Sequence, residues 1–112
     1  MQLLKGVITS FCAVLATAIG AVAAEPLPKL AGQDYGKARA ALLRQDWQPV
    51  TLPDADRCMA GDQRCAGRPE MHACAGTGLA PCIFIWRRKA TTIEVVTEGE
   101  DPVVRRVLLH KN

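Results

Sequence analysis

Few residues of this chain could carry covalent chemistry, and cysteine is the most prominent of them. The sequence holds five cysteines, two histidines and one serine. Ser10 lies in a segment expected to be removed, which excludes a serine nucleophile from the remainder. His72 and His110 lie far apart in the sequence, and each is expected to be an ordinary surface residue. The motifs H-E-x-x-H, G-x-x-x-x-G-K-[ST] and G-x-G-x-x-G do not occur. We therefore expect no enzyme activity, no catalytic residue and no cofactor.

Four cysteines remain once Cys12, inside the apolar N-terminal run, is set aside: Cys58, Cys65, Cys74 and Cys82. An even set in an exported chain is typical of disulfides, and four cysteines allow three connectivities. We favour the two neighbouring pairs, first with second and third with fourth, because each closes a short loop. Each closure would contribute about 2–3 kcal/mol. A zinc site is the alternative, but no C-x-x-C occurs, so no metal is expected.

The N-terminus has the pattern of a secretory signal. A lysine at position 5 precedes residues 6–24, which carry no charge and end in Ala-Val-Ala-Ala. A basic start, an apolar body and small residues at the cut are typical of a cleaved signal peptide. We predict cleavage after Ala24, with Ala23 as the second choice. An uncleaved membrane anchor is the alternative. The mature chain, residues 25–112, is then periplasmic or secreted, without stable insertion in the membrane.

Length and charge limit the mature chain further. Residues 25–112 suffice for one small domain and exclude a TIM barrel or a doubly wound dinucleotide-binding domain. A net charge of +3 over the whole sequence leaves no electrostatic footprint for nucleic acid. We therefore expect a single disulfide-stabilised domain that does not bind nucleic acid.

The first half of the domain predicts one helix and one strand. Asp34 can cap a helix over residues 34–46, whose apolar positions recur at helical spacing. Residues 47–52 predict a short edge strand, because Pro49 cannot donate to a ladder. The cysteine loop, residues 53–81, is rich in Gly and Pro, and a helical turn is expected at residues 69–72. Within it, Gly76-Thr77-Gly78 predicts a tight turn with positive φ.

The last third predicts a three-stranded antiparallel meander over residues 82–87, 91–97 and 103–109, which are rich in β-branched and aromatic residues. The expected fold is α+β: one helix packed on a small antiparallel sheet, made of this meander and the short edge strand, with the disulfide-braced loop beside it.

A register for the meander divides its side chains between two faces. With turns centred near Lys89 and Glu100, Ile85 would pair with Ile93, Val95 with Arg105, and Glu94 with Arg106. The helix would then cover the face that holds the odd-numbered residues Ile83, Ile85, Ile93, Val95, Val103, Val107 and Leu109.

The opposite face is the predicted binding face, formed by Phe84, Trp86, Arg88 and Arg106. Aromatic residues and arginine are enriched in protein interfaces. In an alternative arrangement, the cysteine loop folds over this face and Trp86 belongs to the core.

The leading functional prediction is a non-catalytic binding module in the bacterial periplasm, with an envelope protein as its partner. The alternative is an inhibitor, in which the stapled cysteine loop plugs an envelope hydrolase.

Two resemblances add to these predictions. About a quarter of the chain resembles a PASTA domain. The matching residues are Leu30 to Tyr35, Ala38-Arg39, Leu42 and Trp47-Gln48-Pro49-Val50. That resemblance implies a strand, a helix and a second strand, with binding of peptidoglycan stem peptides or β-lactams. The chain as a whole also resembles small exported proteins of Gram-negative bacteria. The residues that carry this second resemblance are Tyr35, Ala38-Arg39, Trp47-x-Pro49, Pro69-Glu70, Cys74-Ala75-Gly76-Thr77-Gly78 and Cys82-x-Phe84-x-Trp86. This second resemblance implies residence in the envelope and supports a Cys74–Cys82 pair.

Overall fold

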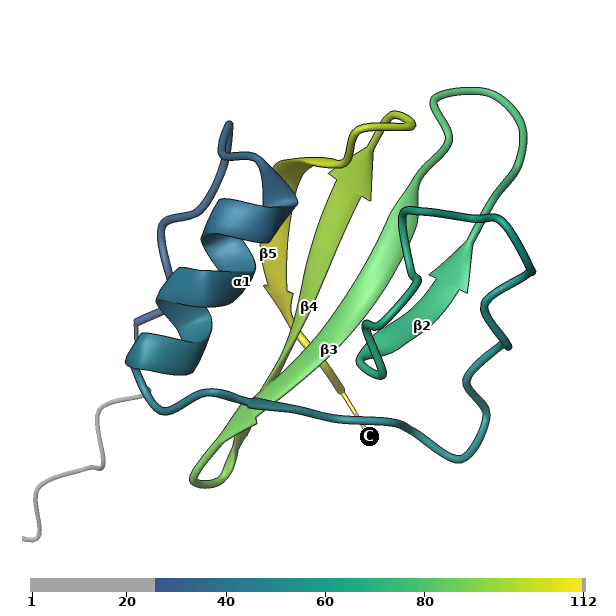
Figure 1. Cartoon of the computed structure of the whole chain (residues 1–112). Coiled ribbons are helices and arrows are strands. Elements are labelled where there is room, and N and C mark those ends of the chain that lie inside the picture. The colour runs from purple at the N-terminus through teal and green to yellow at the C-terminus, as the bar shows by residue number, and fades with distance from the viewer. Residues whose placement is uncertain (1–25, 112) are drawn as a thin grey trace, which may run out of the picture.

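The computed structural model describes residues 26–111, so the predicted signal peptide lies outside the described residues. These described residues form one helix and five strands: α1 (Tyr35–Arg44), β1 (Gln48–Pro49), β2 (Met71–Cys74), β3 (Cys82–Arg88), β4 (Thr91–Glu98) and β5 (Val103–Leu109). Figure 1 shows α1 lying across the sheet beside β4 and β5, while the long segment between β1 and β2 winds along the β2 side. The α+β fold, with a C-terminal meander and one helix, is confirmed.

All strand pairs are antiparallel, and β3 lies inside the sheet. The main order is β1-β3-β4-β5, and β2 also pairs with β3. β1 pairs with the C-terminal part of β3, at Trp86 and Arg87, whereas β2 pairs with its N-terminal part, from Cys82 to Phe84. Two short strands therefore share one edge of β3.

Helix α1 forms where its capping residue and apolar spacing predict it. The Asp34 side chain accepts a hydrogen bond from the backbone N–H of Lys37 at 3.1 Å, which satisfies one of the free donors at the helix start. Tyr35, Ala38 and Leu42 are buried on one side of the helix. After the helix, Asp46 adopts a φ of 65°, which turns the chain toward β1.

The predicted register of β3 and β4 is wrong by one residue. The structure pairs Trp86 with Ile93 and Ile85 with Glu94. The cause is the turn, which has two residues, Lys89 and Ala90, between the paired Arg88 and Thr91, instead of the expected three. Side chains alternate between the two faces along a strand. The one-residue difference therefore places Phe84 and Trp86, rather than Ile83 and Ile85, on the same face as Ile93 and Val95.

The predicted register of β4 and β5 is also wrong. Val95 pairs with Val107, and Glu94 lies opposite Leu108 rather than Arg106. A bulge between Val96 and Thr97 shifts the ladder by an extra residue, a feature that alternation alone does not reveal.

Two local predictions in the first part of the domain need correction. The predicted strand at residues 47–52 is reduced to β1, two residues long. The predicted helical turn at residues 69–72 is wrong, because Met71–Cys74 forms β2 and extends the sheet. Pairing with β3 satisfies the backbone of this segment better than one isolated helical turn would. The prediction of positive φ in the glycine turn is confirmed at Gly78, where φ is 64°.

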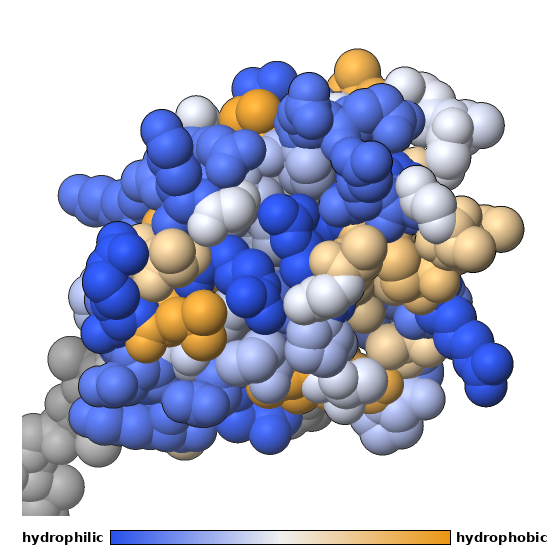
Figure 2. Space-filling view, viewed as in Figure 1, coloured by the Kyte–Doolittle hydropathy of each residue, from blue (hydrophilic) through white to orange (hydrophobic). Residues whose placement is uncertain are grey.

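The core lies between α1, the cysteine loop and the sheet face that holds Phe84 and Trp86. The buried cluster gathers residues from the helix and its flanking segments, the cysteine loop and the strands β2 to β5: Leu30, Tyr35, Ala38, Leu42, Trp47, Cys65, Met71, Cys82, Phe84, Trp86, Ile93, Val95 and Val104. On β4 the core side chains are Ile93 and Val95, as predicted, but on β3 they are Phe84 and Trp86 in place of Ile83 and Ile85. Figure 2 shows mostly hydrophilic side chains over this side of the molecule, with a group of more apolar ones toward the right, over the loops.

Both favoured disulfides are confirmed. Cys58 is bonded to Cys65, and Cys74 is bonded to Cys82. The second bond joins residues that are paired in the β2–β3 ladder. Among residues 26–111, no helix is long and apolar enough to cross a bilayer.

Candidate functional site

The four residues of the predicted binding face do not lie together on one exposed surface. Phe84 and Trp86 have no exposed surface and belong to the core. Arg88 lies on their side of the sheet, with its guanidinium 4.6 Å from the Trp47 ring, and donates to the carbonyl oxygen of Gln45 at 2.9 Å. Of the four residues, only Arg106 is exposed, and it lies on the other face, where its strand position pairs with Val96. The prediction that these side chains form one exposed face is wrong, because of the one-residue register difference.

A buried polar cluster ties the cysteine loop to the helix. The Glu70 carboxylate, fully buried, accepts hydrogen bonds from the Tyr35 hydroxyl at 2.9 Å and from Nε of Arg39 at 2.6 Å. The Trp86 indole N–H donates to the Tyr35 hydroxyl at 3.1 Å. The Arg68 guanidinium lies 4.8 Å from the centre of the Tyr35 ring. One carboxylate thus joins the loop, α1 and β3.

The electrostatics of this cluster indicate a structural tie. Burial raises the pKa of Tyr35 far above its usual range, and the Glu70 carboxylate adds to the effect, so the hydroxyl stays a donor. The hydrogen bond to Glu70 raises the pKa of Arg39. A carboxylate without exposed surface cannot meet a ligand from solution, and its donors already occupy it.

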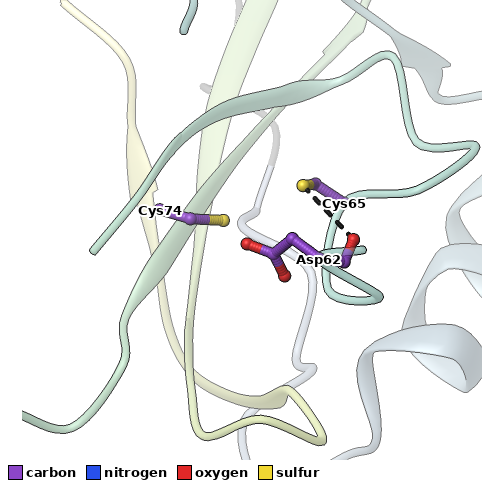
Figure 3. Close-up of side chains that lie close together, drawn as sticks. All are labelled: Asp62, Cys65 and Cys74. Atoms are coloured by element: carbon purple, nitrogen blue, oxygen red, sulfur yellow. Dashed lines mark hydrogen bonds between the residues drawn. The ribbon is translucent and has the colours of Figure 1, made fainter. Parts of the chain in front are cut away.

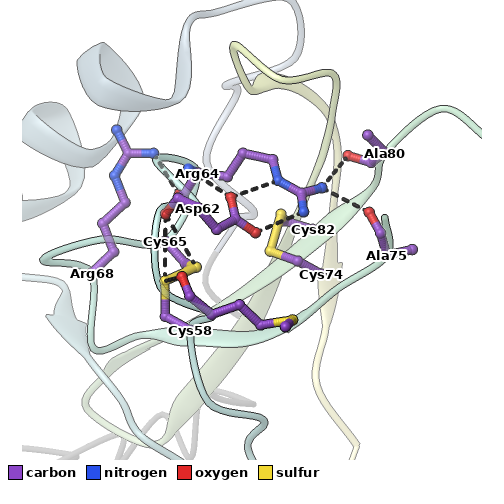
Figure 4. Close-up of a disulfide and its surroundings, with 10 residues drawn as sticks. Cys58, Asp62, Arg64, Cys65, Arg68, Cys74, Ala75, Ala80 and Cys82 are labelled. Carbon is purple, nitrogen blue, oxygen red and sulfur yellow. Dashed lines mark hydrogen bonds and ion pairs between the residues drawn. A yellow bond between two sulfur atoms is a disulfide. The ribbon is translucent and has the colours of Figure 1, made fainter. Parts of the chain in front are cut away.

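A second buried charge, Arg64, fastens the cysteine loop to the connection between β2 and β3 (Figure 4). Its guanidinium forms two hydrogen bonds with the Asp62 carboxylate, at 2.9 and 2.7 Å. It also donates to the carbonyl oxygens of Ala75 and Ala80, at 2.7 and 3.2 Å. The hydrogen bond from Arg64 holds the pKa of Asp62 below its usual range. This arginine braces two loops from within.

The β2–β3 loop, residues 75–81, is held at several points. The Cys74–Cys82 disulfide closes its base, and the backbone N–H of Ala75 donates to the carbonyl oxygen of Pro81 at 2.8 Å. The carbonyl oxygen of Leu79 accepts from the backbone N–H of Gly99 at 2.9 Å. The Leu79 side chain, however, is 69% exposed. The loop is therefore a braced projection with an apolar side chain at its surface.

The sheet hollow lies on the face opposite α1 and has a volume of about 310 Å³. Its apolar lining comes mainly from β2, β3, β4 and β5: Ala73, Pro81, Ile83, Val96 and Leu108. Leu108 is 40% exposed. Two charged residues also line the hollow, Glu94 from β4 and Arg106 from β5. Small ligands and partner side chains bind in apolar hollows of this kind, with a few polar groups to orient them.

The two charged residues of the sheet hollow differ in their contacts. The Glu94 carboxylate already has a partner within the chain, because its Oε1 lies 2.9 Å from Nδ1 of His110. Within residues 26–111, the Arg106 guanidinium has no hydrogen-bond or ion-pair partner, and Arg106 is exposed. The hollow thus offers apolar surface next to an available cation.

The two histidines are not brought together by any contact within the described residues. His110 contacts Glu94, as above, and Nε2 of His72 lies 3.8 Å from the Asp54 carboxylate. Neither arrangement places a histidine against a nucleophile.

Sequence reasoning missed the grouping of residues around the sheet hollow and the buried position of Glu70. Tyr35 and Arg39 stand four residues apart, which places both on one side of a helix and could have indicated a shared polar partner. Nothing in the local sequence marks Glu70 as that partner, since it lies 31 residues after Arg39.

A comparison of this chain with known protein families, curated proteins and solved structures finds no match. The resemblances to PASTA domains and to small exported proteins of Gram-negative bacteria therefore stay predictions.

Proposed function

We propose that this chain is an exported, disulfide-braced binding module that docks a protein partner on the sheet hollow. One observation carries the proposal: the face opposite α1 leaves an apolar hollow open beside an arginine without a partner among residues 26–111. Trp86 and Val95 of the same meander, in contrast, are fully buried in the core.

The chemistry of the sheet hollow defines the partner surface that fits it. Ile83 and Leu108 offer apolar area that burial against a partner would remove from water, whereas Val96 is already buried. Arg106 offers a planar donor that pairs well with a carboxylate. The partner should therefore present an apolar side chain close to an Asp, a Glu or a chain terminus.

The disulfides support the proposed compartment. Two bonded pairs among residues 26–111 are consistent with an oxidising compartment outside the cytoplasm. They also hold the cysteine loop and β2, which contributes Ala73 to the sheet hollow.

Site-specific photocrosslinking in the native cells tests the proposal. A photoreactive phenylalanine at Leu108 should form one dominant adduct, to be identified by mass spectrometry and then purified. The matched control is Leu43, on α1 and similarly exposed, which should not form that adduct.

The interaction is then measured with the purified partner. Arg106→Glu should weaken its affinity at least about tenfold, since a charge pair at a desolvated contact turns into repulsion. Arg44→Glu, in the last turn of α1, should leave the affinity unchanged. Equal adducts at Leu108 and Leu43, or equal affinities of the two arginine variants, would contradict the proposal.

The β2–β3 loop favours one second candidate, an inhibitor of an envelope hydrolase. A projection braced by a disulfide and by Arg64, with exposed Leu79, fits a concave cleft at low entropic cost. Here the test is the same crosslinking experiment with the probe at Leu79. The inhibitor function would be supported if the probe at Leu79 crosslinks a hydrolase that the unmodified protein inhibits and the Leu79→Asp variant does not. An adduct from the probe at Leu108 alone would argue against it.

A further inference from the structure

The two disulfides lie side by side. The Sγ atoms of Cys65 and Cys74 belong to different bonds, yet they lie within 4.8 Å of each other and of a carboxylate oxygen of Asp62. Figure 3 shows the Cys74 side chain and the Asp62 carboxylate pointing toward one another, with Cys65 beside them. Both sulfurs are bonded, so the group is not a thiolate metal site in the oxidised chain. Its geometry suits a different chemistry.

Access to the four sulfur-bearing residues is unequal. Cys58 is exposed, whereas its partner Cys65 retains 2% of its surface and Cys82 retains none. An external thiol therefore reaches the Cys58 end of the first bond most easily. Attack there releases Cys65 as the leaving thiolate, inside the molecule and next to Cys74.

We propose that the two neighbouring disulfides form a thiol–disulfide exchange site, which passes electrons from an external dithiol reductant to the Cys74–Cys82 bond. The first thiolate of the reductant bonds to Sγ of Cys58, and the Cys58–Cys65 bond breaks. The Cys65 thiolate then attacks Sγ of Cys74, and Cys82 leaves as a thiolate that takes up a proton. The second thiol of the reductant displaces Cys58 as a thiol.

The exchange balances in atoms and electrons. The dithiol loses two electrons and two protons and becomes a disulfide, while the protein gains two thiols, at Cys58 and Cys82. One protein disulfide remains, between Cys65 and Cys74. This step needs no oxidant.

Asp62 and Arg64 make the site compatible with a thiolate. An unpaired carboxylate so close to Cys65 would repel the anion. The Arg64 guanidinium, at 2.7 Å from the carboxylate, offsets that charge. Arg64 also bonds to Ala75 and Ala80, so it retains its hold on the β2–β3 loop after the base disulfide opens. Exchange would therefore loosen this loop without detaching it.

The variant Cys58→Ser tests the central step without any reductant, because it leaves Cys65 as a free thiol. The protein is incubated at pH 8, quenched in acid, alkylated with N-ethylmaleimide and digested without reduction. We expect a peptide linked through Cys65 and Cys74, together with alkylated Cys82, at a rate independent of protein concentration. Alkylation at Cys65 alone, with the Cys74–Cys82 bond intact, would overturn the proposal.

A matched control places the thiol elsewhere on the same loop. Met59→Cys in a Cys58→Ser/Cys65→Ser background carries one free thiol at a position that is 78% exposed. It should leave the Cys74–Cys82 bond intact under the same conditions. Exchange as fast as in Cys58→Ser would show that any nearby thiol suffices and would overturn the assigned role of Cys65.

The unmodified protein provides a second measurement that does not depend on how the variants fold. After treatment with limiting dithiothreitol, molecules with two free thiols are isolated and mapped in the same way. The Cys65–Cys74 linked peptide, with label at Cys58 and Cys82, is the expected product. Its absence, with label only at Cys58 and Cys65 or only at Cys74 and Cys82, would refute internal exchange.

Discussion

At the scale of single residues, the domain depends on two charged groups that the fold has taken out of water. Glu70 and Arg64 are both buried, and each meets an oppositely charged side chain and neutral hydrogen-bond partners as well. Buried charges are tolerated only when they are paired and hydrogen-bonded. Both residues lie in the cysteine loop, so the loop is held by polar contacts as well as by sulfur.

Removing the partner of Glu70 should cost much more than removing an exposed arginine. Arg39→Met keeps most of the side-chain length but leaves the buried carboxylate with Tyr35 as its remaining described donor. We expect the free energy of unfolding to fall by about 3 kcal/mol. Arg105→Met is the control, since Arg105 is half exposed and 3.5 Å from Glu98, and should cost at most about 0.5 kcal/mol. Urea unfolding measures both, and equal losses would refute the role given to Arg39.

Asp62 should make part of the stability depend on pH. Arg64 lowers the pKa of this carboxyl in the folded protein, so the ionised form is favoured by folding. The resulting stability is present above the pKa of the unfolded chain and is lost as the pH falls through the lower folded value. The difference in unfolding free energy between the wild type and Asp62→Asn should therefore be constant from pH 7 to pH 5.

Below about pH 4, the usual range for an aspartate, that difference should shrink. Asp101→Asn, at an exposed position in the turn before β5, serves as the control and should follow the wild type at every pH. Urea unfolding at a series of pH values gives the answer. A constant difference down to pH 2.5 would show that the Asp62–Arg64 pair does not contribute in this way.

At the scale of elements, the β3–β4 turn decides which face of the sheet enters the core. The turn places Lys89 at a φ of 53°, in the left-handed region that glycine adopts most easily. The sequence Arg-Lys-Ala has no Asn-Gly or Asp-Gly signal for a two-residue turn. The strands could therefore be predicted from their β-branched residues, but their register could not.

Lys89→Gly should stabilise the protein because it removes that backbone strain. The left-handed conformation costs residues other than glycine about 1–2 kcal/mol. The greater entropy of glycine in the unfolded state offsets about 0.5–1 kcal/mol of the gain from removing that strain. We expect a net gain of about 0.5 kcal/mol in the free energy of unfolding. Ala40→Gly, within α1 and exposed, should instead lose about 1 kcal/mol. A loss in Lys89→Gly as large as in the helix variant would contradict the turn geometry.

The elements differ in how far local sequence determines them. α1 could be predicted because its cap, Asp34, and its apolar spacing are local. β2 could not, since Met71–Cys74 is a strand only because β3 offers it a partner. The bulge between Val96 and Thr97 has no local signal either. Long-range pairing thus decided every element that the sequence misassigned.

At the scale of the whole molecule, the sequence predicted the disulfide frame but not the candidate site. The two favoured bonds followed from short loops along the chain. The sheet hollow needs the correct register, because the same one-residue difference that buries Phe84 and Trp86 brings Ile83, Val96 and Arg106 together on the open face. Of the four residues of the predicted binding face, only Arg106 lines the hollow.

The proposed function, the docking surface and the exchange chemistry all require a chain that is exported and oxidised. The mass of the protein recovered from its own cells, measured with and without reductant, tests this requirement most directly. We predict a polypeptide that begins at Glu25 and becomes heavier on reduction by the four hydrogens that two disulfides take up. A polypeptide that still begins at Met1 and does not change mass on reduction would contradict the account.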